Sequence, residues 1–385
     1  MGGGLKRIAI LGSTGSIGQQ TLEIGRTFSD RFRIVGLGAG KNATLLAEQI
    51  REFRPRFVSL QPATEGAESP VFPSDASPAQ PVTADEMASH PDVDVVVVAT
   101  SGKAGLTPTL AAIRAGKQVA LANKEVLVMA GAIIMAEARQ RKLEIIPVDS
   151  EHSAIWQCLK GERKSEVARL ILTASGGPFL RQSASQLAEI TPEQALKHPT
   201  WKMGPKVTID SATLMNKGME IIEAHWLFGL PLQRIDVVIH PESVVHSMVE
   251  FIDGSIKAQL SQPDMRLPIQ YAVAHSKRLA NADLPRMDFG RPRSLNFEPP
   301  DTDRFPCLRI ARQAGERGGT YPAVLCAADE VAVDLFLSHR IGFLDIARLV
   351  EDTLDRHQGV IQPTLDQILA ADAWASEHAA KWRPK

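Results

Sequence analysis

A glycine-rich turn between an apolar strand and a helical pattern is the feature that most restricts the fold of this chain. Residues Ile8 to Leu11 form a short apolar run, and Gly12-Ser13-Thr14-Gly15-Ser16-Ile17-Gly18 follows it. Strand, glycine turn and helix in this order are typical of dinucleotide-binding domains, because glycines let the pyrophosphate approach the helix N-terminus. The spacing here is G-x-x-G-x-x-G instead of the usual G-x-G-x-x-G, so the motif alone is a weak signal.

Strand and helix patterns continue to alternate up to residue 149. The patterns predict strands at 32–37, 93–99, 118–122 and 143–148, with helices through Arg114 and over 126–141. Residues 62–83 hold five prolines and are expected to be a surface excursion. We therefore expect a doubly wound parallel sheet that binds its ligand at the strand ends near residues 14, 41, 101 and 123.

The end of the second strand bears on the choice of dinucleotide. A site for NAD would carry an Asp or Glu for the ribose hydroxyls about 20 residues past the glycine turn. The segment Gly38-Ala39-Gly40-Lys41-Asn42 has no acid and has a lysine. A cation without an acid favours the 2′-phosphate of NADP(H). The alternative is that Lys41 lies at the start of a helix and does not bind the cofactor.

Three carboxylates flank the middle of the chain. Asp149 and Glu151 directly follow the strand at 143–148, and Glu220 lies on a helix expected to begin near Thr213, with Asp210-Ser211 as its N-cap. Carboxylates from a strand end and a helix suit a hard divalent cation. Alternatively, these acids are solvated or paired in salt bridges, and their spacing alone does not decide between the two.

Two groups of polar residues in the same region are suited to an anion. Ser175-Gly176-Gly177 forms a turn whose backbone N–H groups and hydroxyl could cradle a phosphate, although it could equally be a plain loop. Ser211, Asn216 and Lys217 lie near the start of the expected helix. Between them, the segment 198–204 has the composition of a lid in which Trp201 covers a ligand, although a lone Trp is more often a core residue.

The remaining part of the chain predicts a second sheet and a helical end. Strands are expected at 236–239, 243–252 and 255–260, and the Asp253-Gly254 turn makes the last two a hairpin. Such an edge could pair with its copy across a two-fold axis, which predicts a dimer. A proline-rich linker follows, and three amphipathic helices are expected at 322–339, 342–357 and 364–382.

Composition excludes several classes of protein. The net charge is −1, with 44% apolar and 23% charged residues, so the chain has no global basic field for nucleic acid or an anionic membrane. The three cysteines are odd in number and far apart, which indicates a reducing compartment. We recognise neither a signal peptide nor an apolar run of the roughly 20 residues that a membrane span needs. The expected location is the cytoplasm.

Together, these motifs resemble the 1-deoxy-D-xylulose 5-phosphate (DXP) reductoisomerases over essentially the whole chain. The resemblance rests on residues 11–18, 122–125, 148–152, 175–179, the segment around Trp201, and 210–220. It implies isomerisation of DXP and its reduction by NADPH to 2-C-methyl-D-erythritol 4-phosphate (MEP), in the non-mevalonate isoprenoid pathway. It also implies Mg²⁺ or Mn²⁺, with Co²⁺ as a third possibility, and a homodimer.

The resemblance completes the expected domain organisation. We expect an α/β chain with an N-terminal Rossmann-like NADPH-binding domain at 1–149. A central α+β catalytic and dimerisation domain at 150–283 would carry a lid at about 197–207. A linker at 284–306 would lead to an all-α domain at 307–385.

The resemblance also implies roles for individual residues. Asp149, Glu151 and Glu220 would hold the cation and, with Lys124, make up the catalytic set. The residues expected to bind the substrate are Lys124, Ser150, Glu151, Ser175, His198, Ser211, Asn216, Lys217 and Glu220. Those expected to contact the cofactor are Thr14, Gly15, Ser16, Ile17, Gly40, Lys41, Asn42, Asn123, Glu125, Met203, Gly204, Ser243 and Met265.

Two rival functions explain less of the sequence. A generic NADPH dehydrogenase, acting for example on a small semialdehyde, explains the dinucleotide-binding pattern of residues 1–149. It does not explain the three clustered acids or the group of Ser, Asn and Lys residues suited to a phosphate. A regulatory protein that senses the dinucleotide without chemistry predicts that no divalent metal is required and that Glu220→Gln is tolerated.

Overall fold

The computed structural model describes residues 4–60, 79–197, 201, 203–275 and 277–384, and the chain divides into two compact units. Unit 1 comprises Met1–Val126, Ala132–Ser153 and Asp264–Pro285. Unit 2 comprises Leu127–Gly131, Ala154–Pro263 and Arg286–Lys385. Both units are built from separate stretches of sequence. The predicted domain boundaries at 149, 283 and 306 stay a prediction.

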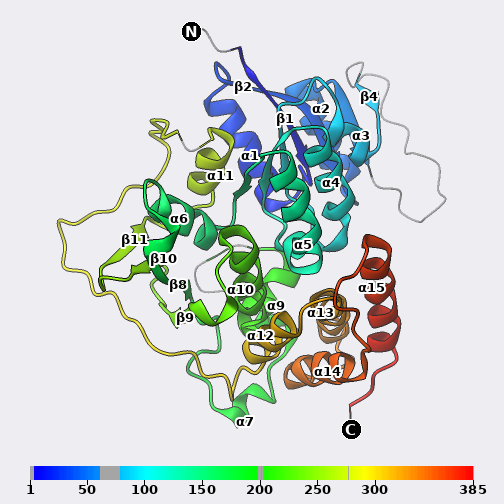
Figure 1. Cartoon of the computed structure of the whole chain (residues 1–385), viewed down its shortest axis with the longest axis vertical. Helices are drawn as coiled ribbons and strands as arrows, with labels where there is room; N and C mark the ends of the chain where they lie inside the picture. The colour runs from blue at the N-terminus through cyan, green and yellow to red at the C-terminus, as the bar shows by residue number, and fades with distance from the viewer. Residues whose placement is uncertain (1–3, 61–78, 198–200, 202, 276, 385) are drawn as a thin grey trace. The chain divides into compact units, whose positions relative to one another are not determined.

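Unit 1 is built on a parallel sheet of seven strands in the order β4-β3-β2-β1-β5-β6-β7 (Figure 1). Every described pairing in it is parallel, which confirms the predicted doubly wound fold. The four valines of β5 are all buried, as expected for a strand in a sheet covered on both faces. Its strands are β1 (Lys6–Leu11), β2 (Phe32–Ala39), β3 (Phe57–Leu60), β4 (Gln80–Pro81), β5 (Val95–Val98), β6 (Gln118–Leu121) and β7 (Ile145–Pro147).

Helices follow these strands as the alternating pattern predicts. The strands β3 and β4 and the helix α3 were not predicted, because they are short. Since β4 lies within residues 62–83 and pairs with β3, the prediction of a surface excursion is wrong at the end of that segment. Residues 61–78 lie outside the described part. The helices are α1 (Ser16–Thr27), α2 (Ala43–Phe53), α3 (Ala84–Ser89), the 3₁₀ turn η1 (Gly102–Gly105), α4 (Leu106–Arg114) and α11 (Arg266–Val273). Two more, α5 (Lys124–Gln140) and α6 (Ser150–Leu159), have residues in both units.

Unit 2 contains a mixed sheet of four strands in the order β11-β10-β8-β9. The predicted hairpin is confirmed, since β10 pairs with β11 in antiparallel fashion across the Asp253-Gly254 turn. The linker contributes one isolated bridge, Glu298 to Ile239. The strands are β8 (Val167–Ala174), β9 (Ile235–Ile239), β10 (Val245–Phe251) and β11 (Ile256–Leu260), with 3₁₀ turns η2 (Lys164–Glu166) and η3 (Leu232–Arg234).

The helices of unit 2 include the predicted C-terminal group, and Figure 1 shows α13, α14 and α15 side by side. An additional helix, α12, precedes them. Its buried residues Cys307, Leu308, Ile310, Ala311 and Ala314 recur at helical spacing, so this stripe was present in the sequence although the helix was not predicted. The helices are α7 (Ala184–Leu187), α8 (Pro192–Ala195), α9 (Pro205–Thr213), α10 (Met215–Phe228), α12 (Cys307–Arg317), α13 (Tyr321–Leu337), α14 (Phe343–Arg356) and α15 (Leu365–Ala380).

One helix boundary was predicted wrongly. Asp210 and Ser211 do not cap a helix that begins at Thr213; they lie in the last turn of α9, whose N-cap is Gly204. Leu214 separates the two helices by taking a left-handed conformation, with φ of 62°. Pro205 directly after Gly204 is a typical first helical residue, so the true start was marked in the sequence.

Candidate active site

The glycine turn of unit 1 depends on two positions that admit no side chain. A Cβ on Gly12, which has φ of +90°, would lie 2.3 Å from the carbonyl oxygen of Ala99. A Cβ on Gly18 would lie 2.2 Å from the carbonyl oxygen of Gly12. Both distances are far below van der Waals contact, so these glycines hold the turn against the end of β5 and the first turn of α1.

The open side of this turn is where a pyrophosphate would approach. Gly15 is the N-cap of α1, and Gly15 and Ser16 are exposed while Thr14 and Ile17 are half-buried. The first backbone N–H groups of a helix favour an anion. From α2, the buried Gln49 donates a hydrogen bond of 2.9 Å to the carbonyl of Ser13. Sequence reasoning missed Gln49, whose partner is 36 residues away.

The end of β2 has the predicted cation. Gly40 is half-buried and Lys41 is exposed, directly before α2. The side-chain oxygen of Asn42 accepts a hydrogen bond of 3.1 Å from the backbone N–H of Leu45 and so caps α2. Lys41 fits the 2′-phosphate hypothesis.

The ends of β5 and β6 are joined by a buried amide. Asn123 donates hydrogen bonds to the carbonyl of Gly102 at 2.9 Å and to the hydroxyl of Thr100 at 3.2 Å. Its oxygen accepts from the N–H of Val126 and caps α5. The neighbouring Glu125 is also buried. Asn123 thus fixes the backbone on which the next residue, Lys124, is carried.

Lys124 and Asp149 form an ion pair in unit 1. The Lys124 Nζ lies 2.5 Å from Asp149 Oδ2, and both side chains are mostly buried. The pair joins the carboxyl ends of the adjacent strands β6 and β7. Ser150 and Glu151 begin α6, and the Ser150 hydroxyl donates a hydrogen bond of 2.5 Å to Glu151. Four predicted residues therefore gather at one edge of this sheet.

Glu220 is held within unit 2. Its side chain is only 1% exposed, and its two oxygens accept from Asn216 Nδ2 at 2.5 Å and Lys217 Nζ at 2.5 Å. These residues are one turn apart on α10, so the predicted common face of Lys217 and Glu220 is confirmed. Asp149, Glu151 and Glu220 all offer carboxylate oxygens, the ligand type that Mg²⁺ and Mn²⁺ prefer.

The Ser-Gly-Gly turn packs against the end of α9, also in unit 2. Gly176 and Gly177 have φ of 82° and 68°, and the hydroxyl of Ser175 accepts the N–H of Gly177 at 3.2 Å. A Cβ on Gly177 would lie 2.8 Å from the carbonyl oxygen of Ser211. The two predicted groups of anion ligands are therefore neighbours in space.

The lid segment is described only in part. His198, with residues 199, 200 and 202, lies outside the described residues. The Trp201 ring lies 6.3 Å from that of His246, whose Nε2 is 2.8 Å from the hydroxyl of Ser261. Burial lowers the pKa of His246 to about 4. Met203 and Gly204 lead directly into α9.

Two further predicted cofactor residues lie at special backbone positions. Ser243 is buried in unit 2 with a left-handed φ of 50°, in the connection between β9 and β10. Met265 is the N-cap of α11, which packs on α1 within unit 1. Neither position contradicts a cofactor contact, and for both that role stays a prediction.

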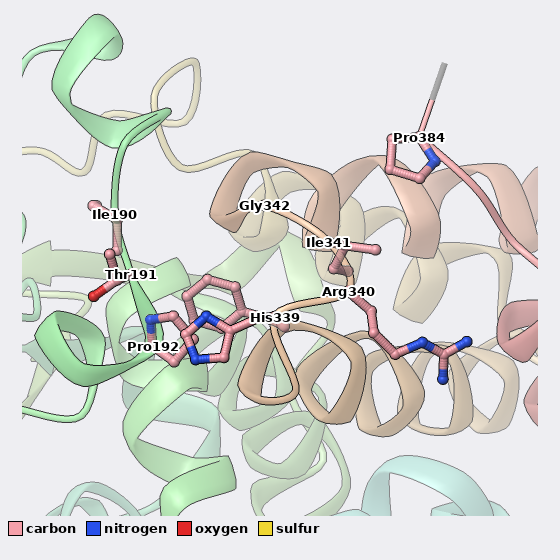
Figure 2. A pocket seen from close by; sticks show the side chains of 9 residues that line it. Ile190, Thr191, Pro192, His339, Arg340, Ile341, Gly342 and Pro384 are labelled. Atoms are coloured by element: carbon pink, nitrogen blue, oxygen red, sulfur yellow. The ribbon is translucent and has the colours of Figure 1, made fainter.

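A separate hollow of about 350 Å³ lies in unit 2 (Figure 2). Ile190, Thr191 and Pro192 line one side of the hollow, and the connection between α13 and α14, which includes His339 and Arg340, lines the other. The His339 ring is paired with Glu193 at 3.0 Å and is largely exposed. None of the predicted site residues that the structure describes lines this hollow.

Family models match three long segments of the chain. A model described as 1-deoxy-D-xylulose 5-phosphate reductoisomerase matches residues 8–131, and its C-terminal domain model matches 145–228. A model described as the DXP reductoisomerase C-terminal domain matches 260–378. The chain belongs to the DXP reductoisomerase family. The predicted family is confirmed.

Individual DXP reductoisomerases match over nearly their whole length. The one from Pelotomaculum thermopropionicum is 51% identical over 98% of both chains. The one from Anaeromyxobacter dehalogenans is 54% identical over 98% of this chain and 97% of its own. Matches of this length confirm that the chain is an oxidoreductase with the family reaction, the NADPH- and metal-dependent conversion of DXP into MEP.

Solved DXP reductoisomerases share the fold. The enzyme from Zymomonas mobilis in complex with NADPH is 41% identical over 98% of both chains, with a TM-score of 0.88. A reductoisomerase in complex with NADPH, fosmidomycin and magnesium is 40% identical over 97% of both chains, with a TM-score of 0.91. These matches confirm the predicted fold class. The individual site residues stay predictions.

Proposed function

We propose that this chain carries out the DXP reductoisomerase reaction with Asp149, Glu151 and Glu220 as cation ligands and Lys124 as the catalytic cation. The observation that carries the proposal is the position of Lys124 and Asp149, 2.5 Å apart at the ends of adjacent strands. Ligands of parallel α/β sheets bind at this edge. The presence of NADPH and magnesium in solved relatives supports the same cofactors here.

The proposed NADPH site uses the glycine turn and the neighbouring strand ends. The N–H groups at the start of α1 would face the pyrophosphate, and Lys41 would pair with the 2′-phosphate. Asn123 and Glu125 would contact the cofactor near Lys124. Gly40 and Asn42 would line the part of the NADPH site that holds the adenosine. Met203, Gly204, Ser243 and Met265 complete the proposed contacts.

The three carboxylates fit a hard divalent cation because each offers carboxylate oxygen ligands. Lys124 pairs with Asp149, and Lys217 pairs with Glu220. When bound, the cation would polarise the substrate carbonyl and orient its neighbouring hydroxyl. The ammonium of Lys124 would then be available to hydrogen-bond substrate hydroxyls and to stabilise negative charge that develops on oxygen.

The phosphate of the substrate is assigned to Ser175, Ser211, Asn216 and Lys217. The close packing of Gly177 on Ser211 supports this assignment, because it places two hydroxyl-bearing turns together. Ser150 would contact substrate hydroxyls, and His198 would close over the substrate. Binding energy from a phosphate remote from the reacting carbons can drive closure of the lid around Trp201.

We also propose a homodimer in the cytoplasm. The strand β11 is an edge of its sheet, and Ile252 and Ile256 beside the hairpin turn are 71% and 52% exposed. An apolar edge strand is a template for pairing with a second copy. The three cysteines are buried and form no disulfide, which suits a reducing compartment. None of the helices in the described ranges is long and apolar enough to cross a membrane.

The deciding experiment is NADPH oxidation with DXP as substrate, with Mn²⁺ and then with EDTA. We expect oxidation that depends on DXP, that EDTA abolishes and that added metal restores. Oxidation that survives EDTA would leave a dehydrogenase without the three-carboxylate site. Folded protein that binds NADPH and oxidises none of it would support the dinucleotide sensor.

A second experiment tests the dimer. Analytical ultracentrifugation compares the sedimentation of wild type with that of Ile256→Lys, and we expect this variant to weaken the dimer.

A further inference from the structure

A half-buried lysine in unit 2, Lys206, joins two buried acids that belong to different helices. The Nζ of Lys206, in the first turn of α9, lies 2.6 Å from Asp210 on the same helix. It also lies 2.7 Å from Asp329 on α13. Asp329 has no exposed surface and Asp210 almost none. One ammonium therefore binds two carboxylates that are removed from water.

The local energetics of α9 do not explain this lysine. A cation in the first turn of a helix opposes the helix macrodipole. The pair Lys206–Asp210 also has the less favourable order, with the cation N-terminal to the acid. A buried carboxylate such as Asp329, in contrast, requires a compensating cation. The position of Lys206 is therefore explained by the contact with α13.

The helix held in this way carries predicted active-site residues at both ends. Met203 and Gly204 lead directly into its first turn, and Ser211 lies in its last turn. The Ser211 carbonyl is also the atom that a Cβ on Gly177 would meet. A shift of α9 would therefore displace Met203, Gly204 and the proposed phosphate ligand Ser211 together.

We propose that Lys206 is a positioning residue for the reaction: its bridge to Asp210 and Asp329 locks α9 onto α13. This inference rests on the proposed function and extends it, because it makes the C-terminal helices part of the substrate site's framework. Lys206 itself contacts neither substrate nor cofactor in this proposal.

Two further contacts support a framework role for the C-terminal helices. The Phe179 ring, just past the Ser-Gly-Gly turn, packs edge-on against Phe343 at 5.5 Å, and Phe343 packs against Phe336. A Cβ on Gly218 of α10 would lie 2.4 Å from the Cβ of Ala311 on α12. The elements with the proposed phosphate ligands therefore all rest on helices that follow residue 306.

The test compares Lys206→Met, Asp329→Leu, Asp329→Asn and the double variant Lys206→Met/Asp329→Leu. The control is Lys381→Met, which breaks an exposed pair of Lys381 with Glu377 at the same 2.6 Å distance. The readouts are kcat and KM for DXP, the inhibition constant of inorganic phosphate, and the Tm. If Lys206→Met does not fold, Asp329→Leu and the double variant still remove the bridge.

We expect KM for DXP and the phosphate inhibition constant to rise about 10- to 100-fold in the variants without the bridge. Asp329→Asn keeps an oxygen for the ammonium and should stay close to wild type. In Lys206→Met, Asp329 is a buried acid without the cation that pairs with it in wild type, whereas in the double variant this acid is replaced by Leu. The Tm of the double variant should therefore be higher than that of Lys206→Met, while its KM for DXP stays high. A KM that recovers together with Tm would overturn the proposal, because the cluster would then serve stability alone.

Hydrogen exchange separates this inference from the proposed function. In the double variant, amides of α9 should exchange at least about tenfold faster than in wild type, while those of α15 should not change. Unchanged exchange in α9 would overturn the positioning role. If wild type itself does not oxidise NADPH with DXP, the proposed function fails, and the exchange measurement still decides whether the bridge holds α9.

Discussion

Two of the three acids of the candidate site, Asp149 and Glu220, each have a protein cation at hydrogen-bonding distance. Asp149 has Lys124, and Glu220 has Lys217 together with the amide of Asn216. Removing a charge from water is costly, and a partner cation offsets part of that cost. The same pairing fixes the orientation of these two carboxylates, as a metal site requires. Substitution of one acid therefore affects both the metal and the neighbouring lysine.

Glu220→Gln tests the metal role at this scale. The amide keeps the shape of the side chain but removes a charged oxygen ligand, and Lys217 loses its partner. We expect kcat/KM for DXP to fall about 100-fold and the metal concentration for half-maximal rate to rise. A titration with Mg²⁺ measures both. The matched control is the exposed Glu377→Gln, and wild-type metal dependence in Glu220→Gln would remove Glu220 from the ligand set.

Gly177→Ala tests the packing of the two phosphate groups. Gly177 has φ of +68°, and an added Cβ would lie 2.8 Å from the Ser211 carbonyl. Gly161→Ala is the control, since Gly161 has φ of +86° but no atom within 4 Å of the added Cβ. Both variants should lose about 1 to 3 kcal/mol of stability from the strained backbone. Only Gly177→Ala should also raise KM for DXP about tenfold; equal KM values in the two variants would contradict the assignment.

At the scale of elements, the proposed pyrophosphate site consists of one strand, one turn and one helix. The turn closes because Gly12 and Gly18 let two backbone segments approach, and Gly15 leaves the helix end open. These glycines have different tasks, although they look alike in the sequence. The first two serve the turn itself, whereas the third serves the ligand.

This difference predicts separate effects of alanine in the same turn. Gly18→Ala should lower the Tm, because its Cβ would lie 2.2 Å from the carbonyl of Gly12. The Cβ added in Gly15→Ala would lie no closer than 3.4 Å to another atom, so the Tm of this variant should stay close to that of wild type. The dissociation constant of this variant for NADPH should nevertheless rise about tenfold, since the added methyl group would face the proposed pyrophosphate. Calorimetry and NADPH fluorescence measure the two effects. Unchanged NADPH affinity in Gly15→Ala would move the pyrophosphate elsewhere.

At the scale of the whole molecule, stability depends on pH through buried titratable groups. His246 on β10 is almost fully buried, and burial lowers its pKa to about 4 from about 6.5 in the unfolded chain. The unfolded state therefore binds more protons between these two pKa values. The stabilisation is complete above about pH 6.5 and is lost as pH falls towards about 4, by about 3 kcal/mol in total.

His246→Gln should remove this contribution. Between about pH 7.5 and about pH 5.5, His246 should lower the unfolding free energy of wild type by about 1 kcal/mol. The decrease in unfolding free energy over this range should therefore be about 1 kcal/mol smaller in the variant than in wild type. Urea unfolding followed by Trp fluorescence at the two pH values measures the difference. Comparing each protein with itself cancels any change of stability caused by the substitution at neutral pH. Parallel pH dependence in both proteins would exclude His246 as the source.

The sequence by itself determined the first sheet and placed Lys124 and Asp149 each at the end of a strand. Strand and helix periodicity and the glycine turn are local signals, so the parallel sheet followed from them, whereas the ion pair of Lys124 with Asp149 was not predicted. The hairpin at Asp253-Gly254 and the helices of residues 321–380 were predictable for the same reason. Local patterns, however, placed the helix before Glu220 wrongly, because Asp210-Ser211 resembles an N-cap.

Only the tertiary structure decided the contacts between residues that are far apart in the chain. The bridge from Lys206 to Asp329 spans 123 positions, and nothing within one helix turn of either residue indicates it. The support of Ser13 by Gln49 and the packing of Gly177 on Ser211 are of the same kind. Periodicity shows which face of an element is buried, whereas the partner on that face depends on how the elements pack.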